Sequence, residues 1–291
     1  MTASSTFGVR SMVAPLRRVL VVRPTPVGDF DAAGWRAPET SRLAGEHEEF
    51  CALLAGLGVE VTVAEAPEGL VDACFAYDSV FVVGSGAIAL RMAKPARRGE
   101  PDFLAPEVEQ AGIPLIGRLT APATADGGDM CWLDESTLAV GRGYRTNAAA
   151  HEQLAGLLAA DGVTVARADL PHHRGAAHVM HLMSVVSPVS DDLAVVFEPL
   201  APVPLLELLA ERGYRTVACD PDEFDTQGCN VLAVRPGVVV MTDENPVTRR
   251  SLEAAGVEVH TYEATEINKG DGGPTCLTRP LLRESSIAGT R

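Results

Sequence analysis

The chain has 291 residues, is 46% hydrophobic and carries a formal net charge of −15. This length and composition allow a sizeable buried core in one large domain or two. The negative charge argues against nucleic acid and anionic membrane surfaces as partners and favours a small cationic ligand, although acidity is also a common solubility device.

Cysteine usage and hydropathy predict a soluble cytoplasmic protein with reduced thiols. The six cysteines contain no Cys-x-x-Cys pair, which argues against a zinc ribbon or a redox dithiol. No continuous apolar stretch suits a signal peptide, and none approaches the roughly 20 residues of a membrane helix. We expect a single domain over residues 17–283, since no linker or charge run divides it, with mobile tails at 1–16 and 284–291.

One sequence pattern recurs five times along the chain: an amphipathic segment, a glycine and an extended apolar stretch. The first amphipathic segment shows helical spacing in Phe50, Leu53, Leu54 and Leu57. Each glycine suits the left-handed position just past a helix end, and a strand is expected after it. The glycines, at intervals of 54, 50, 51 and 43 residues, are Gly58, Gly112, Gly162, Gly213 and Gly256.

A second kind of strand is expected before each helix, so that a unit consists of strands, a helix and a closing strand. These strands are predicted at 19–22, 79–83, 137–140, 193–197 and 231–234. A period near 50 residues favours a closed ring of five ββαβ-like units whose ligand site lies on the central axis. An ordinary doubly wound α/β domain also contains repeats of helix, glycine and strand. The spacing alone does not decide between this fold and the closed ring.

In a ring, polar residues from equivalent loops would meet on the axis. Taken singly, most of the candidates have an ordinary explanation as turn residues, solvated arginines, a core histidine, a helix cap or left-handed glycines. Their joint occurrence in one chain favours a site. The candidate segments are 72–78, Arg97-Arg98-Gly99-Glu100, Asp126-Gly127-Gly128-Asp129, Arg145-Thr146-Asn147, His181 and Asp271.

Cys276 completes this series near the C-terminus. The run Gly272-Gly273-Pro274 fixes a close-approach backbone just before it. Such a setting suits a nucleophile at the mouth of a pocket better than a buried structural thiol. Because the thiolate is the reactive form, this cysteine needs a nearby base or cation.

In their order, these motifs resemble the guanidino-group modifying enzymes and, among them, the dimethylarginine dimethylaminohydrolases. The resemblance covers residues 17–283, and it implies the pentein fold, a five-bladed αβ-propeller, in agreement with the repeat. The motifs that carry it are Asp72-x-x-Phe75-x-x-Asp78, Arg97-Arg98-Gly99-Glu100, Asp126-Gly127-Gly128-Asp129, Arg145-Thr146-Asn147, His181-Leu182-x-Ser184 and Cys276.

The resemblance implies a role for each site residue. Three would carry the chemistry: Cys276 as nucleophile, His181 as general acid and base, and Asp126 as the residue that orients His181. Five would bind substrate: Asp72 and Asp78 the guanidinium, Arg97 and Arg145 the α-carboxylate, and Asp271 the α-amino group.

These residue types fit hydrolysis of a guanidinium. Paired carboxylates fix its plane by charge-assisted hydrogen bonds, and its positive charge stabilises the thiolate of Cys276. His181, with an ordinary pKa near ~6.5, would protonate the leaving amine and then activate water. We therefore expect a hydrolase that converts an Nω-substituted free arginine, methylated by preference, to citrulline and an amine, with no metal or organic cofactor.

Three alternatives stay open at this point: an arginine deiminase, an amidinotransferase, and a non-catalytic module that binds an amino acid. The oligomeric state is also open, a homodimer included. One position departs from the family pattern, since Tyr77 stands before Asp78 where the animal enzymes have an acid. We expect Tyr77 to face the pocket for the N-substituent or the rim of that pocket.

Overall fold

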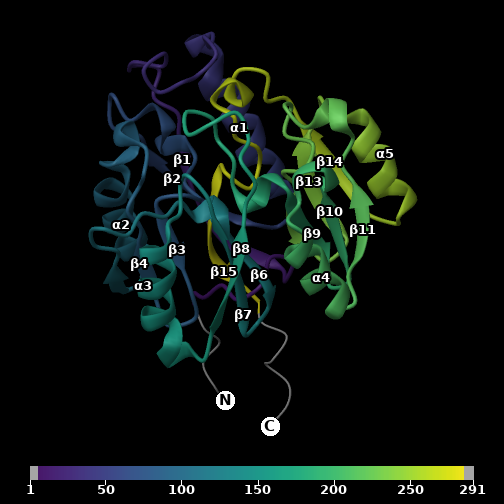
Figure 1. The fold of residues 1–291 in the computed structure, drawn as a ribbon. Coiled ribbons are helices and arrows are strands. Elements are labelled where there is room, and N and C mark those ends of the chain that lie inside the picture. The colour runs from purple at the N-terminus through teal and green to yellow at the C-terminus, as the bar shows by residue number, and fades with distance from the viewer. Residues whose placement is uncertain (1–5, 285–291) are drawn as a thin grey trace.

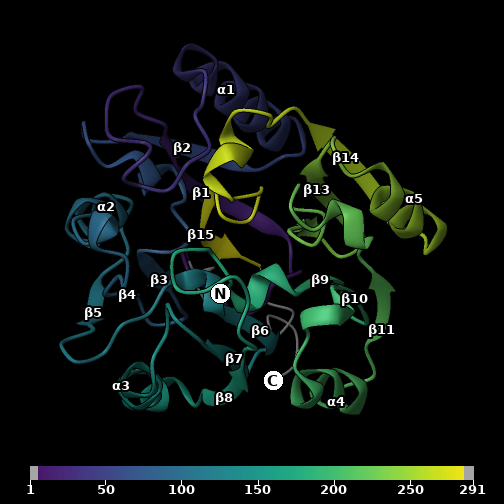
Figure 2. The same ribbon diagram turned by 45° about the horizontal axis from the view of Figure 1, so that its top comes forward.

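The structure is a computed structural model that describes residues 6–284. Within this range the chain forms five three-stranded sheets. The sheets are arranged around a common centre, and the α-helices lie on the outside (Figures 1 and 2). None of the helices between residues 6 and 284 has the length and apolar character needed to cross a membrane.

Each sheet comes from one unit, in which two antiparallel strands are followed by a helix and by a third strand parallel to the second. The first unit contains β15 (Thr278–Arg283), β1 (Leu16–Arg23), α1 (Thr40–Gly56) and β2 (Glu60–Glu65). The second contains β3 (Val80–Val82), β4 (Ala87–Ala89), α2 (Glu100–Gln110) and β5 (Leu115–Arg118). The third contains β6 (Met130–Asp134), β7 (Thr137–Arg142), α3 (Ala148–Leu158) and β8 (Thr164–Asp169). The fourth contains β9 (Val186–Ser190), β10 (Leu193–Val196), α4 (Val203–Glu211) and β11 (Arg215–Ala218), and the fifth β12 (Leu232–Arg235), β13 (Val238–Thr242), α5 (Pro246–Ala254) and β14 (Glu258–Tyr262).

The predicted glycine repeat is confirmed. Each of the five glycines follows a helix, precedes the closing strand of its unit and has a left-handed backbone conformation. Their φ angles are 86° at Gly58, 89° at Gly112, 68° at Gly162, 77° at Gly213 and 89° at Gly256. The alternative of a single doubly wound sheet is wrong, because the strands of different units belong to different sheets.

The sequence predicted only one strand of each antiparallel pair. In the missed strand β13, Val239 and Met241 belong to one buried cluster while Val240 belongs to another, so both faces of the strand are covered. Strands of this kind lack the alternation of polar and apolar residues that marks a half-exposed strand. The missed strands are β4, β6, β9, β13 and β15.

The first sheet joins residues from the two ends of the described chain. β15 pairs antiparallel with β1, which in turn pairs parallel with β2. The segment before β1 adds to this sheet, because Gly8 N donates to Leu281 O at 2.8 Å and Arg283 N donates to Gly8 O at 2.9 Å. The segment Gly8–Leu16 is therefore not the tail that we expected, while residues 1–5 and 285–291 of the expected tails lie outside the described residues.

Apolar burial accounts for this docked segment, and it gives a first prediction. Val9 is 3% exposed and Val13 is 5% exposed. We expect Val9→Asp to lower the free energy of unfolding by roughly 2 kcal/mol or more, because it buries an unpaired charge. Val27, which is 52% exposed, supplies the control, and Val27→Asp should change stability by less than about 0.5 kcal/mol. Equal urea midpoints for the two variants would show that residues 8–16 are not held in the fold.

Candidate active site

Seven of the eight predicted site residues line one cavity, which we call the Cys276 cavity. They are Asp72, Asp78, Arg97, Arg145, His181, Asp271 and Cys276. Phe75, Lys94 and Val179 add to the lining. The eighth residue, Asp126, is fully buried behind His181 and contacts its imidazole.

The repeat explains why these side chains meet. In every unit, the loop before the first strand of the antiparallel pair contributes at least one polar residue to the site. These residues are Asp78 before β3, Asp126 before β6, His181 before β9, Asn230 before β12 and Cys276 before β15. Sequence analysis missed Asn230, although the equivalent position in the fifth unit would have pointed to it.

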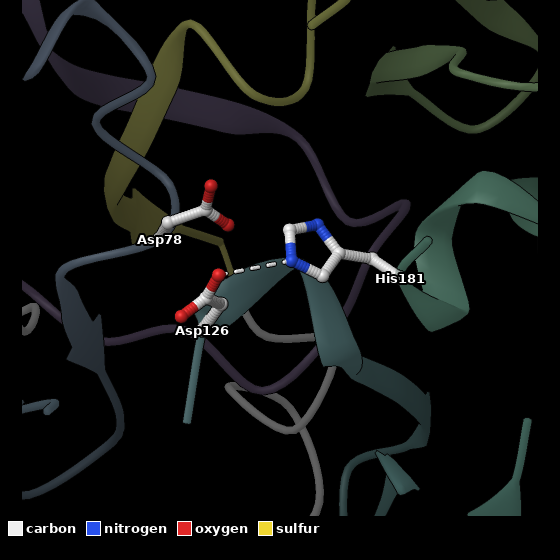
Figure 3. Close-up of side chains that lie close together, drawn as sticks. All are labelled: Asp78, Asp126 and His181. Carbon is white, nitrogen blue, oxygen red and sulfur yellow. Dashed lines mark hydrogen bonds and ion pairs between the residues drawn. The ribbon is translucent and has the colours of Figure 1, made fainter. Parts of the chain in front are cut away.

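Asp78, Asp126 and His181 lie close together in the site. Each offers a donor atom within 4.8 Å of the others, and Figure 3 shows the imidazole directed toward the two carboxylates. His181 Nε2 lies 3.2 Å from Asp126 Oδ2. Such a contact fixes the orientation of the ring and favours its protonated form.

The two glycines of the Asp126-Gly127-Gly128-Asp129 run allow this close packing. A Cβ atom on Gly128 would lie 2.3 Å from His181 Nδ1, and one on Gly127 would lie 2.0 Å from Tyr77 O. Neither glycine has a left-handed conformation. The explanation that these glycines adopt a left-handed loop conformation is therefore wrong. The two glycines are needed because they let the backbone approach His181 and Tyr77 closely.

Arg97 holds the carboxylate of Asp78. Its Nη1 donates to Asp78 Oδ2 at 2.6 Å, while Nε and Nη2 each donate to Glu100 at 2.8 Å. The other oxygen of Asp78 accepts from Gly128 N at 2.7 Å. Burial alone would raise the pKa of Asp78, but Arg97, His181 and the Gly128 amide together lower it, so Asp78 stays ionised.

The pKa of His181 is shifted in the opposite direction from that of Asp78. Burial alone would lower its pKa, but the negative charge of Asp78 and the hydrogen bond to Asp126 outweigh burial and raise it. The charge of Asp129 acts in the same direction. A raised pKa favours the protonated imidazole, which is the form that a general acid requires.

The thiol of Cys276 accepts a hydrogen bond from Asn230 Nδ2, with 3.0 Å between the nitrogen and Sγ. Asn230 Oδ1 accepts from Thr275 N at 3.0 Å, so one amide fixes both the thiol and the backbone beside it. Burial, together with the charge of Asp78, raises the pKa of Cys276 to about 11. The resting cysteine is therefore a thiol rather than a thiolate.

Asp72 and Asp271 are each paired within the chain. Asp72 accepts from Trp35 Nε1 at 2.7 Å and from Lys94 Nζ at 2.5 Å. Arg36 Nη1 lies 2.5 Å from Asp271 Oδ1. Trp35, Arg36 and Lys94 were not predicted, because no motif links them to the carboxylates that they contact.

The group of Asp78, Asp126 and His181 also has donor types found in zinc sites. However, Arg97 already pairs with Asp78, and Arg145 Nη1 lies 3.4 Å from Asp126 Oδ2. Two buried guanidinium groups thus compensate the carboxylates. The arrangement suits a delocalised organic cation better than a compact divalent ion, whose higher charge density needs more uncompensated carboxylate.

Tyr77 does not face this site, so our expectation for it is wrong. Its hydroxyl donates to Met130 O at 3.3 Å, and the guanidinium of Arg279 lies 4.3 Å from the centre of its ring. Only its backbone serves the site, since Tyr77 N donates to Cys276 O at 3.1 Å. Tyr77 and Asp78 lie in the turn before β3, and of the two only Asp78 lines the cavity.

The family model of arginine deiminase matches residues 68–203 and 203–283, which is most of the chain. The chain belongs to the arginine deiminase family. A curated arginine deiminase from Listeria welshimeri is 29% identical over 254 residues, a match that covers 72% of this chain and 61% of that protein. One from Rhodococcus erythropolis is 30% identical over 247 residues, covering 72% and 60%. This member of the arginine deiminase family thus spans about three fifths of the length of the curated relatives that it matches.

Solved structures share the fold of this arginine deiminase family member. The dimethylarginine dimethylaminohydrolase of Pseudomonas aeruginosa in complex with citrulline has a TM-score of 0.75 and 20% identity, and the match covers 91% of this chain and 98% of that one. The N-terminal domain of ArgZ, a cyanobacterial arginine dihydrolase, has a TM-score of 0.77 and 18% identity, with 92% and 97% covered. These similarities establish an α/β pentein fold for the chain.

The pairing of Arg97 gives a second prediction. Arg97→Met should lower the free energy of unfolding by about 3–5 kcal/mol, because it leaves the buried Asp78 and Glu100 without their counter-charge. Arg98 is exposed and supplies a matched control, since Arg98→Met should cost less than about 0.5 kcal/mol. Urea denaturation followed by circular dichroism would measure both, and a stable Arg97→Met protein would contradict the internal pairing.

The raised pKa of Cys276 gives a third prediction. Because only the thiolate reacts with iodoacetamide, alkylation of Cys276 in the free protein should be slow at pH 7 and should accelerate as the pH rises toward about 11. Mass spectrometry of the peptide that contains Cys276 would separate it from the other cysteines. A rate that reaches its plateau below pH 8 would show that the thiolate is already present in the resting site.

Proposed function

We propose that this chain hydrolyses the guanidino C–N bond of a free arginine, giving citrulline. The observation that carries the proposal is the convergence of at least one polar residue from each unit, with Cys276 in the lining of the same cavity as His181 and Asp78. As part of the same proposal, the five sheets close into a five-bladed propeller; the pairing of β15 with β1 within one sheet supports this closure.

The guanidinium would lie between Cys276 and the carboxylate of Asp78. Asp78 is ionised and keeps lone pairs beyond those used by Arg97 and Gly128, so it can accept from the substrate N–H groups. The cation placed beside Cys276 would lower the pKa of the thiol from its resting value of about 11. Substrate binding would thereby generate the nucleophile, and the thiol proton would be released to solvent.

The reaction then follows from the protonation states. The thiolate attacks the guanidino carbon, and His181 gives its proton to the departing nitrogen, which leaves as ammonia or an amine. An S-alkylthiouronium on Cys276 remains. Neutral His181 next accepts a proton from water, and the resulting hydroxide attacks the same carbon. The C–S bond then breaks, the departing sulfur takes up the proton of the new hydroxyl group, and citrulline is released.

Two substrates are candidates for this chemistry. Unsubstituted arginine is favoured by the family and by the curated relatives, which are named arginine deiminase. A methylated arginine is the second candidate, because dimethylarginine dimethylaminohydrolases match this chain over 98% of their own length. Amidino transfer is a third outcome, recognised by a guanidino product that forms only when an acceptor amine is added.

A substrate panel tests the proposal. The protein is incubated separately with L-arginine, monomethylarginine and asymmetric dimethylarginine, and citrulline is assayed together with ammonia or the released amine. We expect citrulline from at least one substrate, and we expect Cys276→Ser to lower the turnover number by roughly 10³-fold or more, since the nucleophile acts in the transition state.

The control for this experiment is Cys51→Ser, which changes a cysteine of helix α1 outside the Cys276 cavity and should leave turnover unchanged. Substantial turnover by Cys276→Ser would rule out the covalent route. Absence of citrulline from all three substrates would refute the hydrolase.

A further inference from the structure

Two cysteines that the proposed reaction does not use, Cys219 and Cys229, lie against each other beside the site. Both are free thiols, both are 2% exposed, and the two thiol groups are hydrogen-bonded to each other. A Cβ atom on Gly228 would lie 3.1 Å from Cys219 Sγ, so the glycine before Cys229 leaves the space that the first sulfur occupies. The two sulfur atoms are therefore within reach of each other.

A small oxidant can reach this pair of thiols. Cys229 lines a cavity of about 240 Å³, and Asp271 lines both this cavity and the Cys276 cavity. A water molecule occupies about 30 Å³, so the space admits hydrogen peroxide, which is little larger.

The two thiols also differ in acidity. The hydrogen bond from Cys229 lowers the pKa of Cys219, while burial raises the pKa of Cys229. The pair therefore loses its first proton more readily than two separate buried thiols would. The thiolate is the form of cysteine that reacts with peroxides, so this shared proton favours oxidation of the pair.

Asn230 connects the pair of thiols to the site. It follows Cys229 directly, and its Nδ2 is the donor that lies 3.0 Å from Cys276 Sγ. Its backbone N donates to Gln227 O at 2.9 Å in the same turn, and Gln227 has a left-handed φ of 69°, which is strained for a residue other than glycine. Cys219, in contrast, is held to β10 by a backbone hydrogen bond of 2.9 Å. A contraction between the two sulfurs would therefore move the turn rather than the strand.

We propose that Cys219 and Cys229 are a redox-sensitive pair: a hydroperoxide converts them to a disulfide, which draws Asn230 away from Cys276 and lowers turnover. An S–S bond is about 2.05 Å long, much shorter than the contact between two hydrogen-bonded thiols. The effect on turnover rests on the proposed function, whereas formation of the disulfide does not.

Hydrogen peroxide supplies the oxidising equivalents. Within the hydrogen bond the proton passes to Cys219, and the Cys229 thiolate attacks one peroxide oxygen. The O–O bond breaks, giving a sulfenic acid on Cys229 and a hydroxide ion. The Cys219 thiol then attacks the sulfenic sulfur, the S–O bond breaks, and the departing hydroxide takes the Cys219 proton and leaves as water. The two sulfurs lose two electrons, and the peroxide gains them.

Peptide mapping tests whether the disulfide forms. No lysine or arginine lies between Arg215 and Arg235, so trypsin leaves Cys219 and Cys229 on the single peptide 216–235. The protein is treated with hydrogen peroxide, the excess is removed with catalase, and free thiols are blocked with iodoacetamide. We expect this peptide to be lighter by two hydrogen atoms and unalkylated, and we expect dithiothreitol to restore both thiols.

Two measurements on the same samples test the effect on the site. Citrulline formation should fall by about 10- to 100-fold on oxidation, the value of one hydrogen bond to a charged group, and should recover with dithiothreitol. The hydrogen bond from Asn230 favours the thiolate of Cys276, so its loss should also slow alkylation of Cys276 by at least about 3-fold at a fixed pH below about 11.

Two variants make these measurements specific. Cys219→Ser should retain turnover in the reduced protein and should lose the response to peroxide. Cys51→Ser is the matched control, because Cys51 is more exposed than either thiol of the pair, and it should respond to peroxide as the unchanged protein does. Thermal melting checks that each variant is folded, and Cys219→Ala replaces Cys219→Ser if the latter is not.

Each outcome decides a separate point. A peptide 216–235 that keeps both thiols after peroxide treatment overturns the inference. A disulfide that leaves turnover and Cys276 alkylation unchanged overturns the connection through Asn230. Equal inactivation of Cys219→Ser assigns the loss to direct oxidation of Cys276 and also overturns it. If the reduced protein forms no citrulline from any substrate, the proposed function fails, while the peptide map and the alkylation rate still decide the inference.

Discussion

Pairing of buried charges is the constraint on which the site depends. Arg97 is shared between Asp78 and Glu100, and Asp126 lies between His181 and Arg145. Loss of one partner from such a pair costs about 3–5 kcal/mol, which is a large part of the 5–15 kcal/mol that stabilises a typical domain. Loops without regular structure are thereby held in one arrangement. Burial raises the pKa of Glu100 to about 7 even beside Arg97, which shows how strongly this environment disfavours charge.

Glycines make the paired arrangement sterically possible. Gly128 lies against His181, and Gly127 lies against the carbonyl of Tyr77. Gly273 is placed in a similar way, because a Cβ atom on it would lie 2.8 Å from the side-chain amide carbon of Asn230. That amide donates to the thiol of Cys276, so backbone at Gly273 must approach it closely. The glycine pairs therefore serve the site through the space that they leave, while the five repeat glycines serve the fold through their left-handed φ.

The sequence predicts local features well and predicts side-chain contacts between different loops poorly. The turn after each helix needs only a glycine and the helix before it, so the repeat was readable, and the repeat in turn indicates where the site lies. In contrast, the contact of Lys94 with Asp72 depends on how two loops fold together. The sequence identifies Arg97 as part of a motif. It does not predict that Arg97 donates hydrogen bonds to Glu100 and Asp78, because no spacing rule specifies these contacts. For Tyr77, a neighbour of Asp78 in sequence, only the structure gives the side-chain direction.

The pairing of β15 with β1 also determines when the first sheet can be completed during synthesis. Arg17, in β1, donates to Glu284, which lies 267 residues further along the chain. During synthesis β1 is made before β15 and has one edge without a partner until β15 is made, and such long-range pairings form slowly. Cys276 immediately precedes that strand. The proposed nucleophile therefore emerges from the ribosome together with the strand that covers the open edge of β1.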